Sequence, residues 1–150
     1  MTTPTIDDSP VWDAVVTQTA GNISPLLRPS ALPAAIVDVG VDQAKFDPYA
    51  FQVRYEGDGI VLYVQAGRLN PAPVPAGGSE EQVTVRGETG TLVRADVANP
   101  TAEMWLYWHE PGTLLDEANR PVDDWLYELR SEGLDSDALL RIAGSLRPYP

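Results

Sequence analysis

The chain has 150 residues, with 10 Lys and Arg against 22 Asp and Glu, and so a formal net charge of −12. Phosphate backbones and anionic membrane surfaces attract cationic proteins, so this charge argues against nucleic acid and anionic lipid as partners. The chain has no cysteine and a single histidine, His109, which excludes disulfides, thiol catalysis, Cys-ligated metals and multi-histidine metal centres.

The length and composition predict one domain, with residues 1–8 as a disordered tail and residues 9–150 as the folded part. The first residues lack the basic and apolar regions of a signal peptide, and no apolar run approaches the roughly 18 residues of a membrane helix. We expect no cofactor, no metal and no membrane insertion. The localisation stays unknown: cytoplasmic as written, or extracytoplasmic if an N-terminal anchor was removed.

The first predicted element is a short amphipathic helix over residues 10–20. Ser9 offers a capping hydroxyl, Pro10 suits the first helical turn, and Gly21 is a typical stop. Trp12 lies on the apolar stripe of this helix and is expected to face a core. Prolines then predict irregular structure until about residue 34.

From there the hydrophobic period changes to two, which is typical of short strands. The predicted strands are residues 34–39, 51–55, 60–65, 82–85, 91–95, 104–109 and 125–130. An Asp-Gly pair at 58–59 predicts a hairpin between the second and third strands. The run 60–64 is apolar on both faces, as in a central strand covered on both sides, and residues 70–81 predict a long exposed loop.

A last helix is predicted after Gly133, capped by Asp135 or Ser136 and ended by Pro148. Its apolar stripe contains Leu139, Ile142, Ala143 and Leu146. Together these elements predict an α+β fold, a mostly antiparallel twisted sheet of about six to seven strands with an N-terminal helix and a C-terminal helix packed on it.

Two neighbouring predicted strands hold five aromatic residues, including three of the four tryptophans. Trp105 and Tyr107 alternate along one strand, and Trp125 and Tyr127 along its expected partner. One interpretation is a core strand pair, with the last helix over one face and either the N-terminal helix or the proline-rich segment over the other. The other is an aromatic groove for an apolar, carbohydrate or peptide ligand, edged by the loop that begins at His109. Trp105, Tyr107, His109, Trp125 and Tyr127 are therefore the candidate ligand-binding residues.

Catalytic and metal chemistry have weaker signals. His109 next to Glu110 could pair a general base with a carboxylate, but adjacent strand residues point to opposite faces, and no catalytic residue is predicted. Four carboxylates gather in the following loop: Asp116, Glu117, Asp123 and Asp124. They lack the spacing of a calcium loop, so a solvated acidic loop is expected, and whether it binds a cation stays open.

The C-terminal half resembles a known bacterial family. The segments EMWLYW (103–108), WLYELRSEGL (125–134) and DSDALLRIAGSL (135–146) follow one another in the order seen in the bacterial domain of unknown function 4367. Upstream pieces at 32–33, 51–55, 59–65 and 83–87 agree in order, so the likeness spans about residues 30–147. Such domains are typically soluble, outward-facing parts of membrane proteins, some with anti-sigma-factor or sporulation-related segments. This chain departs from that pattern because it lacks the N-terminal membrane segment.

The resemblance implies a sensor or protein-interaction module without catalysis and supplies no site residues. We therefore expect a non-enzymatic binding or regulatory domain whose partner is an unidentified protein or small molecule. One alternative is a small hydrolase-like enzyme that uses His109 with a nearby carboxylate. Another is a structural or assembly protein, and we expect a monomer or a weak homodimer.

Overall fold

The computed structural model describes residues 6–41, 49–67, 73–110, 113–114, 118, 120 and 126–149. Within this part the chain forms two helices, α1 (Ser9–Thr19) and α2 (Ser136–Gly144), and eleven strands. The strands are β1 (Ile23–Ser24), β2 (Leu26–Pro29), β3 (Ile36–Val41), β4 (Phe51–Gly57), β5 (Ile60–Gly67), β6 (Ser79–Val85), β7 (Glu88–Arg94), β8 (Met104–Trp108), β9 (Thr113–Leu114), β10 (Leu126–Glu132) and β11 (Leu146–Tyr149). The predicted α+β class is confirmed.

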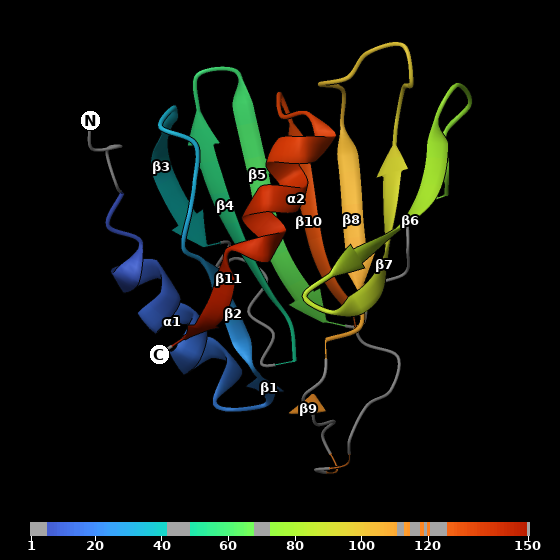
Figure 1. Ribbon diagram of the computed structural model, residues 1–150. Helices are drawn as coiled ribbons and strands as arrows, with labels where there is room; N and C mark the ends of the chain where they lie inside the picture. Colours follow the sequence, from blue (N-terminus) through green and yellow to red (C-terminus); the bar gives the residue numbers. More distant parts are fainter. Residues whose placement is uncertain are drawn as a thin grey trace.

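Seven of the described strands form one antiparallel sheet in the order β3-β4-β5-β10-β8-β7-β6 (Figure 1). β3, β4 and β5 form one meander, and β6, β7 and β8 form the other. β10 lies between them and pairs with both β5 and β8, as predicted for the two aromatic strands. Two short ribbons, β2–β11 and β1–β9, complete the described strands.

Local chemistry explains the tight turns between strands. The β4–β5 hairpin turns at the predicted Asp-Gly pair, where Gly59 has a φ of 71°. A Cβ on Gly57, at the end of β4, would lie 2.0 Å from the carbonyl oxygen of Ala35, so only glycine allows this close approach of β3. The β6–β7 turn uses Arg86, with a φ of 52°, followed by Gly87.

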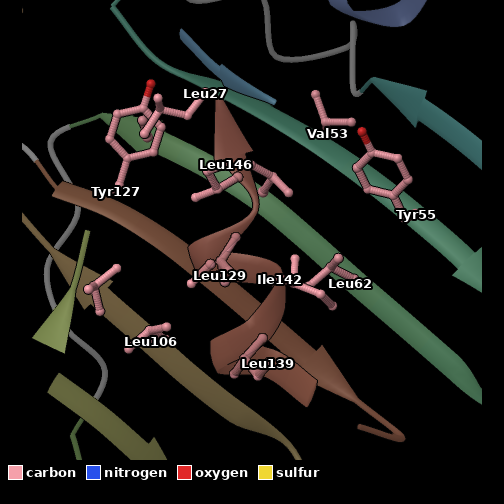
Figure 2. Packing of buried hydrophobic residues seen from close by; sticks show 14 of the residues in the cluster. Leu27, Val53, Tyr55, Leu62, Leu106, Tyr127, Leu129, Leu139, Ile142 and Leu146 are labelled. Atoms are coloured by element: carbon pink, nitrogen blue, oxygen red, sulfur yellow. The ribbon is translucent and has the colours of Figure 1, made fainter. Parts of the chain in front are cut away.

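Both helices lie on the same face of the sheet, with the β2–β11 ribbon between them (Figure 1). Trp12 of α1 donates its indole N–H to the Tyr55 hydroxyl of β4 over 2.8 Å. Figure 2 shows Leu139 and Ile142 of α2 beside residues of β5 and β10. The helix-covered face therefore holds the core, and the alternative with one helix on each face is wrong.

This arrangement corrects the expectation that residues 60–64 are covered on both sides. Leu62 and Val64 of β5 face the core and are fully buried, whereas Val61 and Tyr63 lie on the opposite face and are only half-buried. The long apolar run reflects the central position of β5 in the sheet. The side chains of β5 that point away from the helices, Val61 and Tyr63, are partly covered by neighbouring side chains of the sheet. Neither helix packs on that face (Figure 1).

The chain differs from prediction at two further places. The segment predicted as irregular contains β2, and the last helix ends at Gly144, after which β11 pairs with β2. Pro29 and Pro148 lie in this two-stranded ribbon, where each strand has a free side and tolerates a missing N–H. Leu146, assigned to the helix stripe, is buried from β11 instead.

The predicted tail over residues 1–8 includes Asp8, which the structure places inside the fold. Asp8 is 3% exposed, accepts a hydrogen bond from the Tyr55 hydroxyl over 2.6 Å and pairs with Arg28 at 2.5 Å. Because Trp12 also bonds to Tyr55, this buried polar cluster joins the start of α1 to β4 and β2. The folded part of the chain therefore includes Asp8.

Candidate functional site

The structure separates the predicted aromatic residues onto the two faces of the sheet. Tyr127 lies on the helix-covered face and stacks on Trp108, with ring centroids 5.8 Å apart. Phe51 meets Tyr127 edge-on at 6.0 Å and Trp12 at 5.6 Å, so a row of rings crosses the core. Tyr127 is fully buried, its hydroxyl donates to the Pro25 carbonyl oxygen, and burial raises the pKa of the phenol. In this position Tyr127 stabilises the core.

Trp105 and Tyr107 lie on the opposite face. Trp105 is 6% exposed because Arg130 covers it, with the guanidinium carbon 5.1 Å from the ring centroid. Tyr107 is half-buried beside Glu128. Trp125 lies outside the described residues. Of the four predicted rings, the structure therefore places Trp105 and Tyr107 on the same face of the sheet and Tyr127 on the helix-covered face.

His109 and Glu110 do not form a pair. His109 is exposed just after β8, whereas Glu110 is 7% exposed and its carboxylate is held by other groups. Arg86 donates to both carboxylate oxygens at 3.1 and 3.2 Å, and the Trp108 indole N–H donates over 2.7 Å. Glu110 therefore anchors the β6–β7 turn to the core. A hydrolase-like pairing of the two residues has no geometric support.

The acidic loop falls on the undescribed part of the chain, which includes Asp116, Glu117, Asp123 and Asp124. Among the described residues, no group of three or more His, Cys, Asp or Glu side chains is arranged to hold a metal ion. Whether the loop binds a cation therefore stays open.

The face of the sheet opposite the helices presents two rows of polar and aromatic side chains. We call this surface the open face; it is formed by Gln52, Arg54, Val61, Tyr63, Gln65, Trp105, Tyr107, Glu128, Arg130 and Glu132. Strand register places Gln52 opposite Gln65, and Gln65 opposite Glu128. The Gln52 amide donates to the Gln65 carbonyl over 2.7 Å, and the Gln65 amide donates to the Glu128 carboxylate over 2.8 Å. These three side chains form a hydrogen-bonded ladder across three strands.

The second row runs parallel to the ladder and alternates charge with aromatic rings. Arg54 lies opposite Tyr63, which lies opposite Arg130, which lies opposite Trp105. Each arginine already has a carboxylate partner: Arg54 pairs with Glu56 at 2.9 Å and Arg130 with Glu103 at 3.0 Å. Tyr63 is therefore flanked by two arginines whose charges are neutralised by nearby glutamates.

Two adjoining hollows open on this face and share the side chains of Gln52 and Tyr63. Hollow A has a volume of about 420 Å³ and is also lined by Val61, Glu103, Arg130, Ser131 and Glu132. Hollow B has a volume of about 410 Å³ and is also lined by Gly40, Val41 and Arg54. Volumes of a few hundred cubic ångströms are typical of small-molecule sites, about 300–1,000 Å³.

The electrostatics of the open face favour a ligand that donates hydrogen bonds. Partial burial raises the pKa of the Glu128 carboxyl, and the hydrogen bond from Gln65 and the charge of Arg130 only partly offset that effect. In the ladder, each glutamine already donates one amide N–H to the next side chain. A carboxylate that lacks full solvation gains most from an added donor.

This surface was not predicted from the sequence, although part of the pattern that forms it is present there. The predicted hairpin at Asp58-Gly59 sets a register in which Gln52 must face Gln65. The alternation of Gln52 and Arg54 with apolar residues also indicated a solvent-facing side of β4. The position of Glu128 beside Gln65 depends on the pairing of β10 with β5, which no local pattern specifies.

Comparisons with family models, curated proteins and solved structures found no match to this chain. In the described part of the chain, neither helix is long and apolar enough to cross a membrane.

Proposed function

We propose that the protein is a non-enzymatic binding domain whose ligand contacts the open face at hollows A and B. The observation that carries this proposal is the pair of adjoining hollows on a sheet face that neither helix covers. Tyr63 lines both hollows and offers a half-buried ring with a polar tip, a group suited to recognition. Gln52 borders both hollows, so one ligand can contact both at once.

Binding rather than catalysis is proposed because of how the polar groups are held. The side chains of the ladder are fixed by each other, and the arginines by glutamates, which gives a preorganised surface. In the described residues, His109 shows no hydrogen bond to a carboxylate that could orient it as a general base. The open face therefore offers recognition groups without an activated nucleophile.

A regulatory role is the second part of the proposal. It is supported by the resemblance of residues 30–147 to the bacterial domain of unknown function 4367, whose members include parts of anti-sigma-factor-like proteins. Under this proposal, ligand binding at the open face changes how the domain contacts a partner protein.

A thermal-shift screen tests the proposal with four panels: alkyl amines, amino acids, neutral oligosaccharides and dicarboxylates. A ligand that binds the native state raises the melting temperature by mass action. We expect at least one compound to do so, and Tyr63→Ala to abolish its effect. Gln82→Ala is the matched control, because Gln82 lies exposed on the same face at the far strand β6. No shift with any panel, or equal loss in both variants, would refute the proposal.

A further inference from the structure

Hollow A joins an apolar wall to an excess of negative charge. Val61 and the ring of Tyr63 line one side. Glu103, Glu132 and Arg130 supply two carboxylates and one guanidinium, so the charged lining is net negative. Strand register places Glu132 opposite Val61 and Arg130 opposite Tyr63 on the neighbouring strand, which brings the apolar and charged groups side by side.

Among the described residues, Arg130 is the one cation that lines hollow A, and it is already paired. Arg130 bonds to the Glu103 carboxylate at 3.0 Å, and its guanidinium lies 5.1 Å from the centroid of the Trp105 ring on β8. Both contacts draw its charge toward β8 and away from Tyr63 on β5. Glu132 is exposed and, among the described residues, has no ion pair. The Glu132 carboxylate is therefore available to pair with a cationic ligand.

We propose that hollow A binds an alkylammonium group, a claim that rests on the proposed function and specifies its ligand. The methylene chain packs on Val61 and Tyr63, and the ammonium group donates to Glu132, which lies opposite Val61 on the neighbouring strand. The Tyr63 ring attracts the same cation through its π face. An anion would instead meet Glu103 and Glu132, and Arg130, the one arginine among the described lining residues, is already paired with Glu103.

The same alkylammonium chemistry occurs in a free diamine and in the side chain of lysine on a partner protein. Cadaverine and Nα-acetyl-lysine methylamide are the two probes, titrated at low salt and followed by NMR chemical shifts. Saturation with cadaverine alone assigns a small-molecule ligand, and saturation with the lysine derivative assigns a protein partner; either result supports the proposal. Nα,Nε-diacetyl-lysine methylamide keeps the chain but lacks the charge, so we expect no saturable binding.

Glu132→Gln removes the unmatched carboxylate from an exposed position where folding is unaffected. An exposed ion pair of up to about 1 kcal/mol corresponds to a loss of affinity of up to about fivefold. Tyr63→Ala removes the ring, and Tyr63→Phe should retain binding because it keeps the π face. Glu80→Gln is the matched control: it makes the same charge change on the same face, in the distant strand β6.

Equal weakening by Glu80→Gln and Glu132→Gln would show general attraction of cations to an acidic protein and would overturn the assignment. Equal binding of the diacetylated probe would overturn it as well. If neither amine probe binds but another panel of the screen yields a ligand that is lost in Tyr63→Ala, the alkylammonium assignment fails and the proposed function stands. If no panel yields a ligand, both fail.

Discussion

Arg86 and Glu110 form a buried ion pair whose removal tests the described packing directly. The Glu110 side chain is 5% exposed and that of Arg86 20% exposed, and the guanidinium bonds to both carboxylate oxygens. A second arm of the same guanidinium donates to the Leu146 carbonyl oxygen over 2.6 Å. Arg86→Ala leaves a buried carboxylate with only the Trp108 N–H, and leaves the Leu146 carbonyl without this donor.

Breaking a buried ion pair by removing one partner costs about 3–5 kcal/mol. Because a fifth of the Arg86 side chain is exposed, water can partly solvate the orphaned Glu110, so the lower limit applies. A loss of about 3 kcal/mol corresponds to a fall in melting temperature of about 6–12 °C for a chain of this size. The variant should still fold, since small domains have about 5–15 kcal/mol of stability.

Urea denaturation followed by far-UV circular dichroism measures this loss, with the m-value expected to stay unchanged. Arg86→Gly gives an internal control, because Arg86 has a φ of 52° and glycine relieves about 1 kcal/mol of left-handed strain while losing the same ion pair. The double variant Arg86→Ala with Glu110→Gln should cost less than the sum of the single variants. If the two changes add within about 0.5 kcal/mol, the residues are not coupled and the reasoning is refuted.

Three other predictions follow from buried groups. Burial raises the pKa values of Tyr55 and Tyr127 above the ordinary 10.0. The two neutral phenols therefore contribute fully to the free energy of unfolding below about pH 10, and this contribution is lost as pH rises toward the folded-state pKa values. Unfolding free energies that stay flat from pH 9 to 11 would contradict this. Gly133→Ala should cost at least about 2 kcal/mol in thermal unfolding, because its Cβ would lie 1.9 Å from a carbonyl oxygen at a φ of +87°, whereas Gly144→Ala, in open space, should be neutral or stabilising. Trp125→Phe leaves three tryptophans that are at most 6% exposed, so acrylamide should quench the remaining fluorescence weakly, and strong quenching would count against the described core.

Most local elements could be predicted because their signals lie within a few residues. Pro10 lies in the first turn of α1 as predicted, but the predicted Ser9 cap is wrong, because the helix begins at Ser9 itself and Asp8 precedes it without a side-chain capping bond. At the start of α2 the Asp135 carboxylate accepts the Ala138 N–H over 2.8 Å, as the capping pattern indicates. The Asp-Gly hairpin placed β4 against β5 for the same reason. Such signals depend on backbone conformation over one turn, so they survive without knowledge of the rest of the fold.

The remaining features depend on contacts between residues far apart in the chain. Pro29 and Pro148 argued against regular structure, yet β2 and β11 pair with each other because a two-stranded ribbon leaves one side of each strand free. The sequence made Tyr127 a candidate for a groove because it lies on the same side of its strand as Trp125. Which face of that strand is covered depends on where both helices pack, and helix position is a tertiary property. Hollow A was missed for the same reason, since its walls come from three strands.

The net charge of −12 acts on a ligand mainly through carboxylates that have no arginine partner. Five arginines are paired with carboxylates in the described structure: Arg28, Arg54, Arg86, Arg94 and Arg130. These pairs neutralise half of the ten basic residues, whereas most of the acidic residues in the described part of the chain have no arginine partner there. Carboxylates without partners dominate the field outside the protein, which concentrates cations near the surface and repels anions. Specific binding at hollow A must therefore be separated from this background by its salt dependence. The general attraction falls steeply within the roughly 8 Å screening length of physiological salt, while the contacts of an alkyl chain with Val61 and Tyr63 persist.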